Sequence, residues 1–403
     1  MGLVLALGFL QNLVLARILG PEGLGHLAIV NRVMGFAALL ATGGLTTSIL
    51  RYAAAERQEN AAWALYQRGL LLAGGLSLII TLAVVLLPAT PAWVFDPIAG
   101  IWLPLAAIVL PLQSAAYCAI QYCQSRQRMR AKAVLQLVEK LTLVIAMVSG
   151  AWLDGFRGAV IAFVIGTTVS SVIAWAFTAR FRALPSVPSP IPSGELLRFG
   201  AWSVFTNFQG VIVLSADVMC LSALVSDAAT VGFYALAVTF QQIVRIPMGA
   251  YLDARFPEMV RVSHDVERLR TLRRRMRNHV LGIAAVAVVA VGVIAPWIIP
   301  PVFGEPFRAS VLPLEILLAG HLFSSLGVAQ GRSMLASGWV EGNFWAGLLA
   351  AVSNIALNLT LIPIFGIEGA AAATALTYLV WTVSVELMCR WHEGRRVRDR
   401  RAT

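Results

Sequence analysis

Three basic side chains lie inside long apolar stretches of this 403-residue sequence: Arg32, Lys140 and Arg245. A charged group is costly in an apolar environment, and one that is retained there generally faces a cavity, binds a ligand or pairs with an opposite charge. Three cations in such places favour an anionic ligand. Arg245 follows two amide side chains, Gln241 and Gln242, by about one turn, and these could contact the same ligand.

Each of the three cations also has a plainer interpretation. Arg32 or Arg245 could extend its head group to the membrane surface, or pair with a buried carboxylate. Glu139 stands next to Lys140 as a ready salt-bridge partner. We favour a cavity-facing role for Arg245 and leave both interpretations open for Arg32 and Lys140.

Acidic and titratable groups occur in the apolar stretches as well. Asn207, a candidate ligand-binding amide, and Asp217 fall on one polar stripe of the segment SVFTNFQGVIVLSAD. Asp217 is a candidate for H⁺ or Na⁺ coupling or for pairing with an arginine, and we favour the pairing. Glu315 and His321 form a candidate proton relay, because histidine titrates near neutral pH. A single helical histidine more often bonds a neighbouring group, which is the interpretation we prefer.

The segments that must position these residues are membrane-spanning helices. The composition is 59% hydrophobic and only 13% charged, against about 25% charged in soluble proteins. Apolar runs of about 20 residues, the length that crosses a bilayer, recur throughout. The sequence therefore predicts an all-α polytopic membrane protein. The twelve predicted spans are 2–18, 24–50, 69–88, 101–122, 133–153, 157–178, 200–224, 229–252, 279–300, 308–330, 341–362 and 367–389.

The distribution of Lys and Arg predicts how these helices are oriented. Most of the 31 basic residues follow the even-numbered spans, including the run RLRTLRRRMRNH between spans 8 and 9. Because cytoplasmic loops are enriched in Lys and Arg, both termini are predicted to be cytoplasmic. The net charge of +11 is then loop charge beside anionic lipid headgroups. We expect membrane lipids, and no nucleic acid, as partners.

The sequence repeats itself once. GFRGAVIA at 155–162 matches GIEGAAAA at 366–373, and GHLA at 25–28 matches GFYA at 232–235, with spacings of 211 and 207 residues. Six spans in each copy predict two parallel lobes around a central cavity, an arrangement typical of transporters. The predicted divisions are an N-terminal six-helix lobe at 1–182, a Pro-rich cytoplasmic linker at 183–199, a C-terminal six-helix lobe at 200–390 and a basic cytoplasmic tail at 391–403.

The four cysteines predict neither redox nor metal chemistry. They lie in or beside the predicted spans without a CxxC motif or a His/Cys cluster, so we expect no disulfide, metal site or cofactor. Met1 leads directly into an apolar segment without a basic stretch before it, so we expect no cleavable signal peptide. The short first span leaves room for residues upstream of Met1.

Four stretches carry a family pattern. They are ARILGPEGLGHLA (16–28), ARFPEMVR (254–261), VFGEPFRAS (302–310) and LNLTLIPIFGIEGAAAATAL (357–376). As a set they resemble the oligosaccharide flippases of the multidrug/oligosaccharidyl-lipid/polysaccharide exporter superfamily. The resemblance extends over essentially the whole chain, although members usually carry some polar residues before span 1.

The resemblance implies a twelve-helix flippase, not an enzyme, in the bacterial cytoplasmic (inner) membrane. It would move a polyprenyl-pyrophosphate-linked oligosaccharide from the inner to the outer leaflet for O-antigen, capsule or exopolysaccharide synthesis, alongside glycan polymerase machinery. Arg32 and Arg245, on equivalent helices of the two halves, would then pass the pyrophosphate across the membrane. Lys140 would meet the pyrophosphate near the cytoplasmic mouth, and the three amides named above would contact the pyrophosphate or the sugar.

Three other classes fit less well. A multidrug cation antiporter of the same superfamily would favour an acidic cavity, whereas three bases lie inside the spans here. A membrane enzyme such as a glycan polymerase needs a sizeable outer loop that carries catalytic groups, and the predicted outer loops are short and hold no Ser/His/Asp set. A scaffold protein has no need of buried charges or of a two-lobe repeat.

Overall fold

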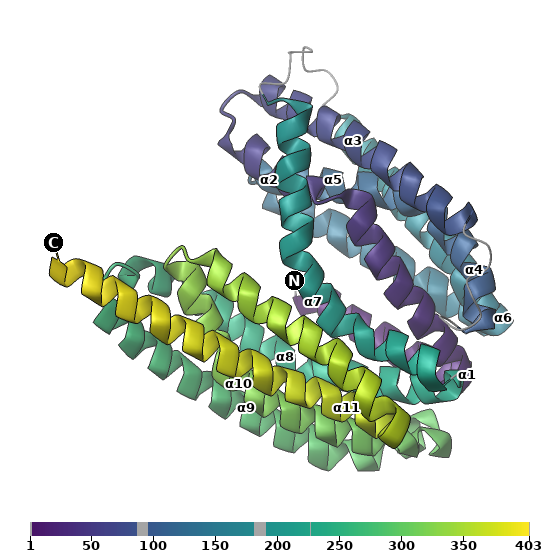
Figure 1. Cartoon of the computed structure of the whole chain (residues 1–403). Coiled ribbons are helices and arrows are strands. Elements are labelled where there is room, and N and C mark those ends of the chain that lie inside the picture. Colours follow the sequence, from purple (N-terminus) through teal and green to yellow (C-terminus); the bar gives the residue numbers. More distant parts are fainter. Residues whose placement is uncertain (1, 87–95, 181–190, 226, 403) are drawn as a thin grey trace. The chain divides into compact units, whose positions relative to one another are not determined.

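The computed structural model describes residues 2–86, 96–180, 191–225 and 227–402. Throughout these ranges the regular structure is helical and contains no strand (Figure 1). The chain divides into two compact units, Met1–Val211 and Ile212–Thr403. The all-α fold class predicted from the sequence is confirmed.

The first unit is a bundle in which the long α6 packs along α1 and α5. Its helices are α1 (Gly2–Thr42), α2 (Leu45–Ala55), α3 (Glu59–Leu86), α4 (Pro97–Ala107), α5 (Leu110–Ser125), α6 (Met129–Ala179) and the first part of α7 (Ser193–Val225). α3 lies against α1, α2 and α5. Between α2, α3 and α5 the core holds three mutually packed aromatic rings, those of Trp63, Tyr66 and Tyr122.

The second unit is built around α10. Its helices, after the end of α7, are α8 (Ala228–Val262), α9 (Val266–Phe303), the short 3₁₀ helix η1 (Glu305–Ser310), α10 (Val311–Ala336) and α11 (Val340–Ala402). α10 packs against α8, α9 and α11. A Cβ atom at Gly320 would lie only 2.7 Å from the Cα atom of Ala375. Small residues therefore bring α10 and α11 into close contact, as is common between membrane helices.

The helices provide the twelve predicted spans. Seven are long and apolar enough to cross a membrane, and three of these, Ala6–Thr42, Met129–Ala179 and Val340–Arg395, are 37, 51 and 56 residues long. Each of those three is interrupted at a glycine with non-helical backbone angles and so accounts for two crossings. Two bent helix pairs, α4 with α5 and the two parts of α7, each provide one further crossing, which makes twelve crossings in the described ranges. The chain is a multi-pass membrane protein.

The internal repeat reappears as a repeated backbone geometry. Gly155 and Gly366, the first residues of the two matching stretches, have φ/ψ values of 55/−136° and 57/−129°. A positive φ is unfavourable for residues with a Cβ atom, which explains glycine at both turns. Three residues later, Gly158 and Gly369 lie so close to a carbonyl oxygen eight residues earlier that a Cβ atom would sit 2.0 and 2.3 Å from it. Both halves thus contain the same tight helical hairpin.

The first part of α7 is attached to the first unit. Ser48 Oγ on α2 donates to the carbonyl oxygen of Leu196 at 2.9 Å. A Cβ atom at Gly44, where φ is 66°, would lie 2.1 Å from the carbonyl oxygen of Gly200. This close approach needs glycine on both sides, and it holds the start of α7 against α2.

The predicted domain limits stay predictions. The segment 183–190 of the predicted linker lies outside the described residues, and from Ser193 onward the chain is already α7. The cytoplasmic placement of both termini is likewise still a prediction.

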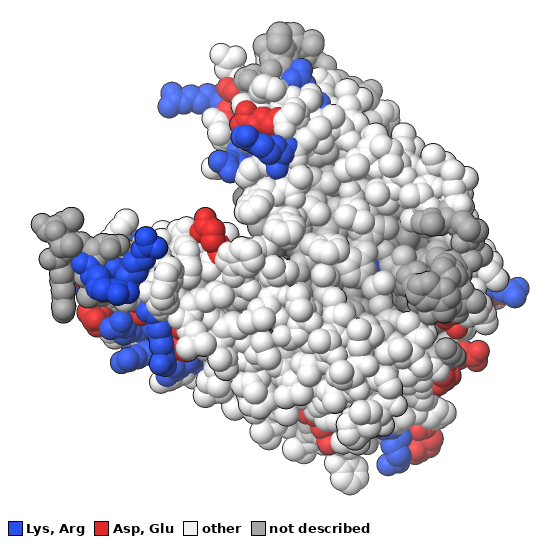
Figure 2. Space-filling model, in the orientation of Figure 1, with Lys and Arg blue, Asp and Glu red and all other residues white. Residues whose placement is uncertain are grey.

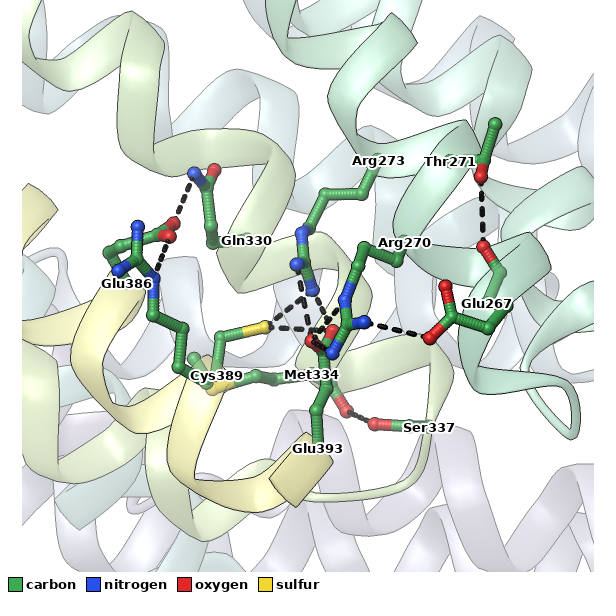
Figure 3. A network of polar contacts seen from close by, with 11 residues as sticks. Glu267, Arg270, Thr271, Arg273, Gln330, Met334, Ser337, Glu386, Cys389 and Glu393 are labelled. Atoms are coloured by element: carbon green, nitrogen blue, oxygen red, sulfur yellow. Dashed lines mark hydrogen bonds and ion pairs between the residues drawn. The ribbon is translucent and has the colours of Figure 1, made fainter. Parts of the chain in front are cut away.

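Apart from the few charged residues inside the spans, charged side chains lie near the ends of the helices. Figure 2 shows broad uncharged surface along the helices, with Lys, Arg, Asp and Glu gathered near helix ends. In the second unit one such end is held by an ion pair, in which Arg273 on α9 donates to the Glu393 carboxylate on α11 (Figure 3). Arg270 lies 3.2 Å from the same carboxylate. Arg273 and Glu393 are only 6% and 3% exposed, and because an uncompensated buried charge is strongly destabilising, this contact fixes α11 against α9.

α4 and α5 together form one bent span. They meet at 58°, just before Pro111, which has no N–H to donate to the carbonyl oxygen of Ala107. The hydroxyl of Thr81 on α3 donates to that carbonyl oxygen at 3.2 Å. A neighbouring helix thus satisfies the backbone group that the proline leaves without its helical partner, as the membrane interior requires.

We expect Thr81→Val to lower the free energy of unfolding by about 1 kcal/mol, because it leaves the Ala107 carbonyl without a donor. The measurement is the unfolding midpoint of the purified protein in detergent. Thr168→Val is the matched control, since Thr168 donates at 2.8 Å to Val164, one turn earlier in its own helix. Equal losses for the two variants would contradict this account of the bend.

Candidate functional site

A buried carboxylate joins three helices of the second unit. Asp217 on α7 is 4% exposed. Its Oδ2 atom accepts a hydrogen bond from the Tyr234 hydroxyl on α8 and another, at 2.9 Å, from the Thr374 hydroxyl on α11. These two hydroxyl donors offset part of the desolvation that burial imposes on the carboxylate. Its predicted pairing with an arginine stays a prediction.

A second polar group lies further along α8 and includes four residues. Gln241 Nε2 donates to the Tyr378 hydroxyl at 3.5 Å. The His321 ring is stacked on the Tyr378 ring, with 5.4 Å between the centroids. The charge of Arg245 acts on both His321 and Tyr378, so its guanidinium lies within electrostatic range of them. α8, α10 and α11 therefore bring three of the predicted residues, Gln241, Arg245 and His321, to one place.

Arg245 differs from Gln241 and His321 in being exposed. Its side chain is open to the surroundings of the unit, whereas Gln241 and His321 are buried. Within the described part of the chain, no carboxylate lies within ion-pair distance of it. Arg245 is thus a cation on a membrane helix that is available to an anionic ligand.

Other predicted residues are placed apart from this group. Gln242 is exposed beside the buried Gln241, because successive residues of a helix point about 100° apart. Glu315 is exposed and His321 buried on α10, and no contact between them occurs in the described structure, so the proposed relay is not assembled there. The side chain of Asn207 lies outside the described residues.

In the first unit, Lys140 is held by a neutral amide. Its Nζ atom donates to Gln11 Oε1 on α1 at 2.8 Å, and Gln11 Nε2 in turn donates to the Met147 sulfur at 3.0 Å. The described residues contain no ion pair between Lys140 and its neighbour Glu139. Arg32 is half-buried on α1. The cationic charge of Lys140 is therefore oriented without a carboxylate in contact with it.

The sequence analysis missed the hydroxyl groups that organise the site. Tyr234, Thr374 and Tyr378 are ordinary residues of apolar segments, and nothing in their spacing connects α8 with α11. One signal was available, because Thr374 and Tyr378 are four residues apart and share a helix face within the small-residue run of α11. Among the described residues no group of three His, Cys, Asp or Glu side chains could hold a metal ion.

The twelve spans, the repeated hairpin and the charges inside the spans define a polytopic membrane protein with the architecture of a transporter. The family model described as polysaccharide biosynthesis protein matches residues 1–263, and the chain belongs to this family. The family resemblance seen in four stretches of the sequence is confirmed.

Two relatives can be compared along much of the chain. The lipopolysaccharide biosynthesis protein WzxC of Escherichia coli (strain K12) is 22% identical over 356 residues, which are 85% of this chain and 69% of that protein. A Haloferax volcanii protein named as a probable low-salt glycan biosynthesis flippase, Agl15, is 25% identical over 282 residues, which are 69% of this chain and 58% of that protein. The match to Agl15 thus spans less than two thirds of that relative's length.

Two solved structures share the fold. Lipid II flippase MurJ in its inward closed conformation superposes with a TM-score of 0.79 at 13% identity, covering 95% of this chain and 85% of that one. An inward-facing multidrug resistance transporter of the MATE family gives a TM-score of 0.81 at 14% identity, covering 98% and 95%. At such identities the likeness establishes the fold alone, and it is equally close for a flippase and for a drug transporter.

We expect Tyr234→Phe to lower the free energy of unfolding by about 1.5 kcal/mol or more, because a hydrogen bond to a charged group is lost. In an Asp217→Asn background the same substitution should cost clearly less, since the remaining bond is between neutral groups. Unfolding midpoints of the four proteins in detergent form a double-mutant cycle that measures this difference. Identical losses in both backgrounds would show that the hydroxyl does not act on the carboxylate.

Proposed function

We propose that this chain is a flippase of the bacterial cytoplasmic membrane. It moves a polyprenyl-pyrophosphate-linked oligosaccharide from the inner to the outer leaflet by alternating access of its two lobes. The cargo supplies O-antigen, capsule or exopolysaccharide synthesis, and a glycan polymerase is the downstream partner. Transport breaks no covalent bond, so the proposal assigns no catalytic residue.

The observation that carries the proposal is the environment of Arg245. It lies about 25 Å along α8 from Ala228, at 1.5 Å per residue, and so within a membrane span. A cation at that depth with no carboxylate in reach, among the described residues, needs a ligand or water to face it. A pyrophosphate can supply several anionic oxygens to one guanidinium in a bidentate geometry.

The relatives support a glycan as cargo and a lipid as its carrier. The names of WzxC and Agl15 refer to lipopolysaccharide and glycan biosynthesis, and MurJ is named as a lipid II flippase. A ligand of this kind combines a polar head with a long apolar chain. It therefore suits a protein whose spans carry cations in an otherwise apolar setting.

A multidrug cation antiporter is the second candidate function. It is favoured by the buried Asp217 and by the MATE transporter of the same fold. Arg245 argues against it, because an exposed guanidinium would repel a cationic drug. We therefore place it second.

The experiment that tests the proposal uses a strain that lacks the gene. Its polyprenyl-linked sugars are fractionated and assigned to a leaflet by their accessibility to an impermeant reagent. We expect completed lipid-linked repeats trapped on the cytoplasmic face, loss of surface glycan, and repair of both defects by the gene. Normal glycan export together with a new drug sensitivity would support the antiporter instead.

We expect Arg245→Ala to abolish transport without affecting membrane insertion, because Arg245 makes no ion pair with a carboxylate among the described residues. The measurements are surface glycan in the complemented deletion strain and the amount of protein in the membrane fraction. Arg261→Ala is the control, since it removes the same charge from an exposed position near the end of α8. A fully active Arg245→Ala variant would contradict the pyrophosphate role.

In this proposal Asp217 is the residue that couples transport to H⁺ or Na⁺. Asp217→Asn keeps an oxygen that can accept from Tyr234 and Thr374, so the fold should persist while the ionisable group is lost. In proteoliposomes the variant should no longer respond to an imposed proton or sodium gradient. A response equal to that of the unchanged protein would remove Asp217 from the coupling mechanism.

A further inference from the structure

A hollow of about 740 Å³ lies in the first unit, between α2 and the start of α7. Its wall includes Arg51 and Tyr52 from α2, and Glu195, Arg198, Phe199 and Trp202 from α7. Pockets that bind small molecules generally measure ~300–1,000 Å³. The contacts of Ser48 with Leu196 and of Gly44 with Gly200 hold the two walls together, so the hollow is preformed.

Arg51 is placed on aromatic rings instead of against a carboxylate. Its Cζ atom lies 4.4 Å from the centre of the Phe199 ring and 5.6 Å from that of the Tyr52 ring. The side chain is exposed, and no acidic group among the described residues lies within ion-pair distance of it. Stacking orients the planar guanidinium and leaves its N–H donors available to an anion.

Arg198 adds a second cation to the hollow and Glu195 adds one anion. Arg51 and Arg198 line the same hollow, one from α2 and the other from α7. The Tyr52 hydroxyl donates to Glu195 Oε1 at 2.9 Å. Two arginines and one glutamate leave the wall with an excess of one positive charge, which favours an anionic occupant.

We propose that this hollow binds the diphosphate headgroup of the lipid-linked cargo before translocation. The inference rests on the proposed function and adds to it a loading site separate from Arg245. Two guanidinium groups can share the several anionic oxygens of a diphosphate. Trp202 and Phe205, 58% and 50% exposed, present ring surface to the carbon chain or sugar attached to it.

The hollow lies at the membrane boundary where such a cargo enters. α2 continues past residue 50, the predicted end of span 2, and α7 begins before residue 200, the predicted start of span 7. The distribution of Lys and Arg in the sequence predicts that both of these ends are cytoplasmic. This is the side on which the proposed cargo is loaded.

An ordinary anionic phospholipid is the competing occupant, because aromatic and basic residues also contact headgroups at membrane interfaces. Two guanidinium groups in the wall of one hollow favour a diphosphate over a single phosphodiester charge. The two occupants are distinguished by competition, with farnesyl diphosphate as the probe and phosphatidylglycerol as the competitor.

The experiment measures binding of labelled farnesyl diphosphate to the full chain in phosphatidylcholine nanodiscs. We expect Arg51→Gln and Arg198→Gln each to weaken binding by about tenfold or more. Glu195→Gln should tighten binding a few-fold, because it removes the negative charge while keeping an acceptor for Tyr52. An unfolded variant could not bind more tightly, so this opposite sign separates the proposal from misfolding.

Arg57→Gln is the matched control, because it removes one exposed positive charge just beyond the end of α2 without lining the hollow. Its affinity should stay within about twofold of the original. Equal weakening by Arg57→Gln, or unchanged binding in Arg51→Gln, overturns the proposal. Displacement of the probe by an equal amount of phosphatidylglycerol assigns the hollow to bulk lipid and overturns it as well.

A flipping assay on the same variants distinguishes this inference from the proposed function. Flipping at the original rate by the Arg51→Gln/Arg198→Gln double variant overturns the loading site while the flippase stands. The expected binding pattern without any flipping of lipid-linked glycan by the unchanged protein supports the diphosphate site and overturns the flippase.

Discussion

Every backbone N–H and C=O group in the membrane interior must find a partner within the protein, and the rest of this structure depends on that constraint. It makes each span a helix and allows a break only where something compensates for it. The bend before Pro111 occurs where the Thr81 hydroxyl reaches the Ala107 carbonyl. The hairpins at Gly155 and Gly366 turn over only one or two non-helical residues, so very few backbone groups lose their helical partners.

The span pattern and the internal repeat could be predicted from the sequence, because both follow from local properties. Hydropathy and length predict the twelve spans from the sequence. The paired motifs beginning at 155 and 366 coincide with two turns of the same backbone geometry. The glycines at these turns are local necessities, since they supply a conformation that other residues rarely adopt. Features of this kind can be predicted from the residue types at the positions where they occur.

The partners of the polar groups could not be predicted in this way. Asp217 and Thr374 are separated by 157 residues, and Lys140 and Gln11 by 129. Their contacts depend on which faces of α7, α11, α1 and α6 meet, and that is decided by small-residue packing along whole helices. The sequence could therefore indicate that these side chains needed partners, but it could not identify them. The attachment of the start of α7 to α2 depends on packing of the same kind.

Several basic residues of this chain fall into two groups, those that pair with a carboxylate and those that are held by a neutral group. Arg126, Arg128 and Arg273 are held by the carboxylates of Glu59 and Glu393, an arrangement that neutralises charge and fixes helix ends. Lys140 is held by an amide and Arg51 by aromatic rings, which orient a cation without cancelling its charge. A transporter needs cations of the second kind, because a site already neutralised by a carboxylate must break that ion pair before it binds an anion. The transported ligand must also be released from each site. A cation whose protein partner is neutral, with or without the ligand, has no ion pair to form or break at that step, so it can bind the next anion directly.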